Sequence, residues 1–283
     1  MSFGKNGRRV GSAGAGGSLA GAIVTNALFM LGASFLLGGL KHHVQEYNSV
    51  TARFQSSLLF LATIALLVPS TVANGDTVAA PEFVRLLSVA LSVLLIAAYA
   101  LGLLFSLKTH RELFASRSHH EADVTLLPIV TALATLGVVT VFVALVSEVF
   151  VESVQQAAIT FGMTQAFVGF VVVSLVGAAA EMASAFSGAR KDRLDLSVGI
   201  ALGSASQIAL FVAPVLVLLS YVIGPTPMDL RFWPGAVAMM LFATLTAAFV
   251  TGSGRSAWFM GVLVLTVYLV FAITLFLLPP HLP

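Results

Sequence analysis

Eight long apolar runs, separated by short polar stretches, dominate the chain. They cover 18–40, 56–73, 83–107, 125–151, 166–188, 196–223, 232–251 and 257–279. A helix needs about 20 apolar residues to cross the hydrocarbon core of a bilayer, and its backbone polar groups must be satisfied internally. The pattern therefore predicts an all-α, polytopic membrane protein with eight transmembrane helices.

The polar stretches between the runs are too short to form a separate soluble domain. We predict one membrane domain over 18–283, surrounded by the lipid bilayer, with 18–124 as its first half and 125–283 as its second. Residues 1–17, which end in the Gly-rich stretch from Gly11 to Gly17, are expected to form a flexible leader.

The composition supports this interpretation and excludes several other classes of protein. Hydrophobic residues make up 58% of the chain and charged residues only 9%, whereas a soluble domain carries about 25% charged residues. The 14 basic and 12 acidic residues give a net charge of +2, and no contiguous basic stripe exists to bind a nucleic acid. With no cysteine, thiolate metal sites and cysteine nucleophiles are excluded. Since the sequence has no phosphate-binding Gly-rich loop and no catalytic triad, we expect neither an enzyme nor a cofactor.

The distribution of Lys and Arg predicts the orientation, because these residues are retained on the cytoplasmic side. The loops after the first, third, fifth and seventh runs hold nine of them: Lys41, Arg53, Lys108, Arg111, Arg117, Arg190, Lys191, Arg193 and Arg255. These loops should be cytoplasmic, with the C-terminus outside. In this orientation the basic residues Lys5, Arg8 and Arg9 lie outside the cytoplasm, which disagrees with the retention of basic residues on the cytoplasmic side.

Two nine-residue stretches indicate an inverted repeat. GAIVTNALF from Gly21 and GSASQIALF from Gly203 match at an offset of 182, with Gly and Ala-Leu-Phe coinciding and Thr25 opposite Gln207. The second stretch follows five spans after the first, so the two run in opposite directions through the membrane. Secondary transporters place their substrate site between such repeats, on interrupted helices.

The same offset moves Glu181 to position −1, before Met1 (181 − 182 = −1). We therefore expect that the partner helix preceding the first run is missing and that the chain lacks its natural N-terminal portion. The alternative is that the first run simply starts the protein.

Three carboxylates lie in or beside apolar runs: Glu148, Glu152 and Glu181. No Lys or Arg occurs between Ser118 and Ala189 to pair with them. A charge at the centre of a membrane helix costs about 2.5–3.5 kcal/mol, so such residues usually face a cavity and have a function. Without a base, each carboxylate must be neutralised by a proton or a bound cation, which is the elementary chemistry of a cation/proton exchanger.

Each candidate has a structural alternative. Glu181, among small residues, is either an ion ligand or a protonated structural glutamate. Glu148 and Glu152, four apart, share a helix face, although Glu152 also suits a solvated helix end. The neutral side chains that we consider as further ligands, or as interhelical hydrogen-bonding groups, are Gln207, Ser204 and Ser206.

Backbone features of the same region are also informative. Gly177, with Ser174, is a candidate helix break that exposes carbonyl oxygens, although small-residue packing is the alternative. The spacing Gly199-x-x-x-Gly203 fits a helix close-packing motif. Oxygen ligands of this kind suit hard ions such as Ca²⁺, with Na⁺ and Mg²⁺ left open, and no His lies within a run to favour copper or zinc.

At these residues the chain resembles the calcium/proton exchanger (CAX) family of the cation/Ca²⁺ antiporters. The most specific stretch, Phe167–Pro214, is similar to the family's second α-repeat, which has a Gly-Asn-Ala-Ala-Glu-His motif followed by a Gly-Ser-Ser-Thr-Gln helix. The supporting stretches are SLAGAIVTNALFMLG from Ser18, QSSLLFLATIALLVP from Gln55, LFSLKTHRELF from Leu104 and ALVSEVFVESVQ from Ala144. The resemblance covers nearly all of 18–279.

The resemblance implies an inverted-repeat antiporter fold with its second α-repeat at 166–223 and an incomplete first repeat. Glu181 would be the carboxylate that binds the cation and the proton, with Gln207 as a metal ligand beside it and the nearby serines on the facing helix. The first run would be the second helix of the first repeat, carrying Thr25 and Asn26.

The implied access path involves another helix. Glu148 would line this path, with Glu152 nearby. The chain also departs from the motif: Ala178 replaces its Asn, Met182 its His and Ser174 a usual Pro. We expect the first two changes to weaken coordination and to remove a titratable group near the site.

The leading hypothesis is Ca²⁺/H⁺ antiport by alternating access, with Ca²⁺ and protons as the transported ions, in a bacterial inner (cytoplasmic) membrane. One alternative is exchange of another cation, such as Na⁺. The other is a transport-inactive membrane fragment, which the departures at Ala178 and Met182 and the missing helices motivate.

Overall fold

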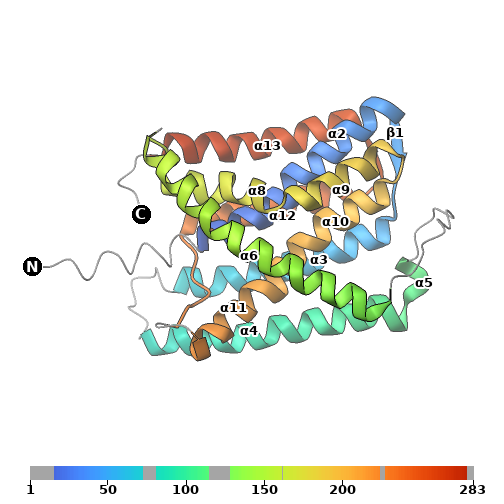
Figure 1. Ribbon diagram of the computed structural model, residues 1–283. Coiled ribbons are helices and arrows are strands. Elements are labelled where there is room, and N and C mark those ends of the chain that lie inside the picture. The colour runs from blue at the N-terminus through green and yellow to red at the C-terminus, as the bar shows by residue number, and fades with distance from the viewer. Residues whose placement is uncertain (1–15, 73–80, 115–127, 161, 224–226, 279–283) are drawn as a thin grey trace, which may run out of the picture.

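The computed structural model describes residues 16–72, 81–114, 128–160, 162–223 and 227–278, which are mostly helical (Figure 1). Six helices of this part are long and apolar enough to cross a membrane: Gly16–His42, Ser49–Thr71, Glu82–Thr109, Leu194–Ile223, Pro234–Thr251 and Trp258–Leu277. The pair Gln165–Gly177 and Ala179–Arg190, bent by 59°, makes a seventh span if it is counted as one broken helix. The prediction of a helical protein with several membrane spans is confirmed.

Shorter elements subdivide and connect these spans. Up to residue 114 they are η1 (Thr25–Met30), α2 (Leu31–His42), β1 (Val44–Glu46), α3 (Ser49–Val72), α4 (Pro81–Leu104), η2 (Phe105–Thr109) and α5 (Arg111–Phe114). From residue 128 they are α6 (Ile129–Thr160), α7 (Gln165–Phe167), η3 (Val168–Val173), α8 (Ser174–Gly177), α9 (Ala179–Arg190), α10 (Leu194–Gln207), η4 (Ile208–Val212), α11 (Ala213–Ile223), α12 (Pro234–Thr251), β2 (Arg255–Ala257) and α13 (Trp258–Leu277). The η elements are π-helical turns, which are rare and frequent at functional sites.

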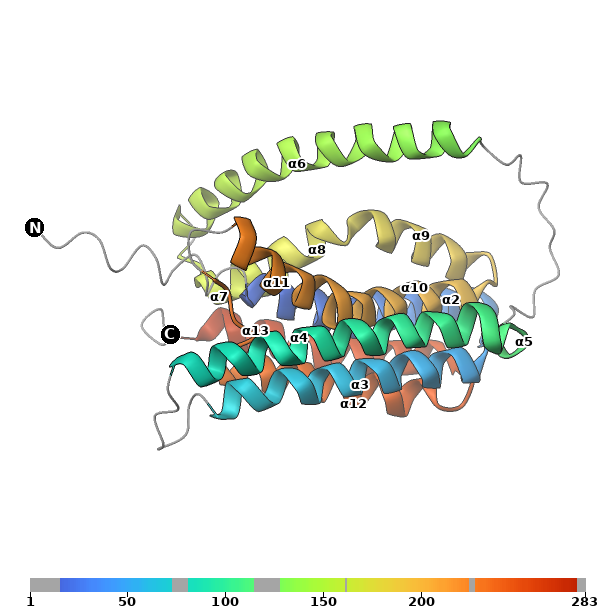
Figure 2. The same ribbon diagram turned by 90° about the horizontal axis from the view of Figure 1, so that it is seen from below.

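The predicted run at 125–151 overlaps α6, which begins at Ile129. Within α6, the apolar helical stretch of the described residues is Ile129–Val143. Figure 2 shows α6 along one outer side of the bundle, and the side chains of Ile129–Val143 are exposed. Eight transmembrane helices therefore stay a prediction.

The second span begins earlier than its apolar run at 56–73 predicts, because a polar residue caps it. Asn48 Oδ1 accepts hydrogen bonds from the backbone N–H groups of Val50 at 2.9 Å and Thr51 at 3.2 Å, so α3 starts at Ser49. The polar residues before 56 thus belong to the helix, and Arg53 Nη2 donates to the carbonyl of Gly252 at 2.7 Å.

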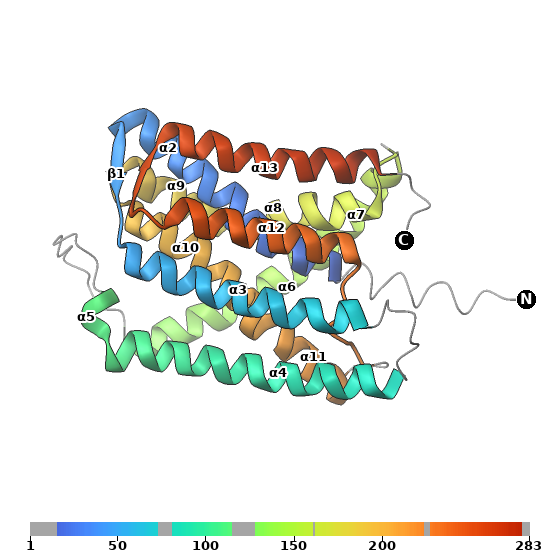
Figure 3. The same ribbon diagram turned by 180° about the vertical axis from the view of Figure 1, so that it is seen from behind.

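Close helix contacts and a short sheet hold the first and last spans together. A Cβ atom on Gly261 of α13 would lie 2.6 Å from the carbonyl oxygen of Gly32, so the two backbones touch where only glycine fits. Strands β1 and β2 pair antiparallel, with Glu46 opposite Arg255 and an ion pair of 2.7 Å between them. Figure 3 shows α12 between α3 and α13.

At the other end of the bundle, serine hydroxyls hold the segment that leads into α12. Three backbone N–H groups donate to them: Met228 to Ser220 Oγ at 2.8 Å, Leu230 to Ser88 Oγ at 3.2 Å and Phe232 to Ser70 Oγ at 3.1 Å. The serines belong to α11, α4 and α3, so this segment ties three helices together.

The two stretches related by the offset of 182 share a local feature. The π-helical turn η1 covers 25–30, and the same offset moves these positions to 207–212, where η4 covers Ile208–Val212. The spacing Gly199-x-x-x-Gly203, in contrast, does not bring two backbones together. A Cβ atom on Gly199 would meet nothing within 4 Å, and one on Gly203 would meet the side chain of Gln55. The close-packing interpretation of these glycines is wrong.

Candidate cation site

Three polar side chains from three helices meet where η1 passes α10 and the beginning of α9. The Asn26 side chain is fully buried, and its Nδ2 donates hydrogen bonds to Ser204 Oγ at 2.9 Å and to Glu181 Oε2 at 3.5 Å. Asn26 and Glu181 are 155 positions apart in the chain. The fold therefore brings together three of the predicted ion ligands from distant parts of the sequence.

A break in the bent span positions Glu181. Helix α8 ends at Gly177, Ala178 has φ −91° and ψ 4°, and α9 begins at Ala179. A break is therefore present at the predicted position. Glu181 lies in the first turn of α9, where the positive end of the helix dipole stabilises a negative charge.

The carboxylate of Glu181 has no basic partner among the described residues. The ion pairs there join Arg231 to Asp229 and Arg255 to Glu46, both in the connecting segments. The side chain of Glu181 is exposed with respect to the described part of the chain. Its charge must therefore be balanced by something other than an Arg or Lys of this part.

One oxygen atom at this site lacks a partner. Asn26 Oδ1 is buried and accepts no hydrogen bond from any described residue. Since an unpaired buried acceptor costs about 1–3 kcal/mol, a bound ion or water would be stabilised beside it. Amide and carboxylate oxygens are also the ligands that Ca²⁺ takes in proteins.

The other predicted ligands make different contacts. Ser206 Oγ donates to the carbonyl of Gly203 at 2.9 Å, and Thr25 Oγ1 is 3.3 Å from Tyr268 OH of α13. The side chain of Gln207 is exposed. No hydrogen bond joins these three residues to Glu181 in the structure, and their role as ligands stays a prediction.

Glu148 and Glu152 both lie in α6, four residues apart. Their side chains fall outside the described residues, so the access path expected there also stays a prediction. Within the ranges that the structure describes, no three His, Asp or Glu side chains gather as a metal site would require. A cation at Glu181 would be held in this part by one carboxylate and by neutral oxygens.

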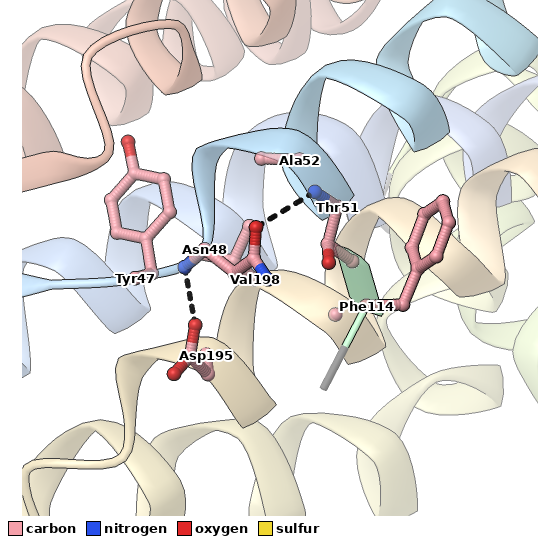
Figure 4. A pocket seen from close by; sticks show the side chains of 8 residues that line it. Tyr47, Asn48, Thr51, Ala52, Phe114, Asp195 and Val198 are labelled. Carbon is pink, nitrogen blue, oxygen red and sulfur yellow. Dashed lines mark hydrogen bonds between the residues drawn. The ribbon is translucent and has the colours of Figure 1, made fainter. Parts of the chain in front are cut away.

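A cavity lies at the loop end of α3 and α10. Its volume is about 70 Å³, and it is lined by Tyr47, Asn48, Thr51, Ala52, Phe114, Asp195, Val198 and Gly199 (Figure 4). The backbone N–H of Asn48 donates to Asp195 Oδ1, which links β1 and α3 to α10. No sequence pattern predicts this cavity, because Asp195 follows three basic residues and resembles an ordinary loop charge.

Tyr268 is a second residue that sequence reasoning missed. It is 3% exposed, and its ring centroid lies 5.2 Å from that of Phe29. A single tyrosine in an apolar run is typical of an aromatic core residue. The contact of its hydroxyl with Thr25 can be seen only in the folded structure.

Comparisons with known proteins identify the family of the chain. The family model described as "Sodium/calcium exchanger protein" matches residues 6–108 and 131–277. The chain is 37% identical to a Ca²⁺/H⁺ antiporter of Aphanothece halophytica over 279 residues, which cover 93% of this chain and 74% of that protein. It is 38% identical to the Ca²⁺/H⁺ antiporter ChaA of Bacillus subtilis (strain 168) over 266 residues, which cover 92% and 74%.

Solved structures support the same assignment. The structure of native YfkE superposes with a TM-score of 0.80 at 34% identity, covering 96% of this chain and 78% of that one. The H⁺/Ca²⁺ exchanger CAX has a TM-score of 0.58 at 16% identity over 95% of this chain and 71% of the other, which supports the fold alone. The chain therefore belongs to the sodium/calcium exchanger protein family and is an integral membrane protein.

Proposed function

We propose that this protein exchanges Ca²⁺ for protons across a membrane. The observation that carries the proposal is the unpaired carboxylate of Glu181, which lies just after a helix break and contacts the buried amide of Asn26. The two relatives described above are named Ca²⁺/H⁺ antiporters, which supports the same activity.

The chemistry follows from the groups around the carboxylate. A proton on Glu181 neutralises it, whereas a cation needs the ionised carboxylate and further oxygens. Two such oxygens belong to the residues around it: Asn26 Oδ1, which is buried and has no hydrogen-bond partner among the described residues, and Ser204 Oγ, which is 2.9 Å from Asn26 Nδ2. Proton and cation therefore compete for one site, and each displaces the other.

The coupling to transport requires that this site opens to one side at a time. In this proposal the two inverted repeats, which share π-helical turns at matched positions, move relative to each other around Glu181. Gln207, Ser206 and Thr25 lie within one helical turn of these contacts and supply oxygens in the course of the movement. Glu148 and Glu152 on α6 line the access path.

The finer assignments complete the proposal. The membrane domain covers 18–283 and has eight spans, with the basic loops in the cytoplasm of a bacterium and the protein in its inner membrane. Lys41 at the end of α2, Arg190 at the end of α9 and Arg255 of β2 lie at one end of the bundle together with β1, whereas Arg231 lies at the other end.

A second candidate is exchange of a monovalent cation such as Na⁺. The observation that favours it is that Glu181 is the carboxylate that contacts Asn26 among the described residues, and one negative charge balances one monovalent ion. The departures from the family motif at Ala178 and Met182 leave a third outcome, a protein without transport activity.

Reconstituted vesicles distinguish these outcomes. With a Ca²⁺ dye inside and a pH gradient imposed, we expect Ca²⁺ to move against the proton flux. Glu181→Gln should reduce this movement to the background of empty vesicles, whereas Glu82→Gln, at the exposed beginning of α4, should leave it unchanged. Full Ca²⁺ exchange by Glu181→Gln would remove this carboxylate from the mechanism, and proton movement that depends on Na⁺ but not on Ca²⁺ would support the second candidate.

A further inference from the structure

The interface between α3 and α10 contains space that side chains do not fill. Gly199 lines the cavity near Asp195, and a Cβ atom on Gly199 would meet nothing within 4 Å. Gly203 lies four residues further along the same face of α10, and a Cβ atom there would be 3.1 Å from Gln55 Nε2. Gly199 therefore leaves open space at the loop end of the bundle, and at Gly203 the side chain of Gln55 occupies the corresponding space.

Two oxygen atoms on α3 face this region without partners. Thr51 lines the cavity, and Gln55 follows it by four residues on the same helix face. Thr51 Oγ1 and Gln55 Oε1 are both buried, and neither has a hydrogen-bond partner among the described residues. Leaving both unpaired would cost about 1–3 kcal/mol each, so water or a cation is expected to contact them.

The line formed by these oxygens continues to the candidate cation site. Gln55 lies opposite Gly203, and the next residue, Ser204, accepts the hydrogen bond of Asn26. Asn26 Oδ1 is the third buried oxygen without a partner along this line. At 1.5 Å per residue, Asp195 and Ser204 are separated by about 13 Å along α10.

The cavity at the outer end has the size and charge of a vestibule. Its volume of about 70 Å³ holds at least two waters, each of which occupies about 30 Å³ in the liquid. Asp195 Oδ1 accepts the bond from the backbone N–H of Asn48, and Oδ2 takes no part in that bond. A carboxylate at such an entrance raises the local concentration of cations.

We propose that this line of oxygens is a hydrated path by which the cation moves between the loop end of the bundle and Glu181. Asp195 attracts the cation at the mouth, and Gln55, opposite Gly203 near the inner end, replaces part of the hydration shell of the cation. The path rests on the proposed function, because it leads to the Glu181 site. In the predicted orientation its mouth is cytoplasmic.

Cysteine labelling tests the path directly, because the natural chain contains no cysteine. Single variants Thr51→Cys and Gln55→Cys would be treated in proteoliposomes with a small, water-soluble thiol reagent. Leu59→Cys is the matched control, one turn beyond Gln55 on α3 and 0% exposed. Since a thiolate reacts only where water reaches it, we expect both test variants to react at least tenfold faster than the control and Ca²⁺ to slow the reaction of Gln55→Cys.

A second measurement separates the path from the binding site. Gln55→Leu keeps the approximate size of the side chain and removes its polar atoms. We expect Ca²⁺ uptake by vesicles to fall about tenfold, while Ca²⁺ binding to the detergent-solubilised protein, which is open to both solutions, stays within about twofold of wild type. Loss of binding together with uptake would make Gln55 part of the site or of the fold and overturn its role as a path residue.

The outcomes for path and function are distinguishable. If Gln55→Cys reacts no faster than Leu59→Cys, the path is wrong whether or not the protein transports Ca²⁺. If the wild-type protein moves no Ca²⁺ but Gln55→Cys reacts and Ca²⁺ protects it, the antiport proposal fails and the hydrated path stands.

Discussion

The first span and η3 are in close contact at Gly21, and Gly21→Ala should therefore destabilise the bundle. A Cβ atom on Gly21 would be 2.5 Å from both Phe170 Cα and Ser174 Oγ, and it would also overlap the carbonyl oxygen of Phe170. Real Cβ contacts are essentially never shorter than 3.0 Å, so the helices must separate by at least 0.5 Å (3.0 − 2.5). The Ser174 hydroxyl can rotate, but the backbone of Phe170 cannot.

The expected magnitude combines two opposing effects. Ala is a better helix former than Gly by about 1 kcal/mol, whereas overpacking costs about 1–3 kcal/mol, with backbone overlaps at the upper end. For Gly21→Ala we expect a net loss of about 2 kcal/mol. The matched control is Gly137→Ala on α6, where the new Cβ would meet nothing within 4 Å and the propensity gain of about 1 kcal/mol should remain.

The assay is the apparent Tm of each detergent-solubilised variant, followed by size-exclusion chromatography after heating. A change of 1 kcal/mol shifts the Tm of a domain of 150–250 residues by about 2–4 °C, so the 3 kcal/mol between the two variants corresponds to about 6–12 °C. If Gly21→Ala melts at or above the temperature of wild type, the close contact between the first span and η3 does not exist, and the placement of Asn26 relative to Glu181 is wrong as well.

Three further predictions concern the connecting segments and α9. Ser88→Ala leaves the buried N–H of Leu230 without an acceptor and should cost about 1–3 kcal/mol, visible as faster hydrogen exchange at 227–233; unchanged exchange would contradict the bond. Burial raises the pKa of Tyr47 to about 12, although hydrogen bonds with Ser253 and Gly254 act in the opposite direction. The contribution of the neutral Tyr47 hydroxyl to stability is therefore complete below pH 10 and is lost as the pH rises through 12. The tyrosinate absorption that wild type shows and Tyr47→Phe lacks should thus appear only above about pH 11, and its appearance near pH 10 would refute the burial. Ala178→Asn should stabilise α9 by about 1 kcal/mol through a new N-cap and leave the Ca²⁺ dependence of exchange unchanged; a shifted Ca²⁺ dependence would make this amide an ion ligand.

The sequence predicts most of the membrane spans, because the length and hydropathy of a single segment determine whether it can cross a bilayer. Six predicted runs correspond to long apolar helices. Boundaries depend on individual polar contacts, which is why the cap at Asn48 moved the beginning of α3 ahead of its apolar run. The placement of α6 beside the bundle depends on packing between distant segments, which hydropathy does not contain.

The candidate site was predictable in part for the same reason. The charge pattern alone predicts Glu181 as a site residue, because no Lys or Arg lies near it in the sequence. Its contact with Asn26, 155 positions away, can be seen only in the folded structure. The repeat matched Thr25 with Gln207, whereas the contact at the site involves the following residue, Asn26. One residue turns a helix by about 100°, which directs Thr25 to Tyr268 and Asn26 to Ser204.

The departures from the family motif at Ala178 and Met182 affect the carboxylate less than the sequence suggests. These two residues are 6% and 7% exposed and lie four apart on the buried face of α9, whereas the Glu181 side chain lies on its exposed face. Ala178 is the N-cap of α9 and makes no side-chain cap, so an Asn there would cap the backbone N–H groups that follow it. The amide that reaches the carboxylate comes instead from Asn26. The motif changes therefore remove a helix cap and a core imidazole, not the contacts of Glu181, and they argue only weakly for a protein without transport activity.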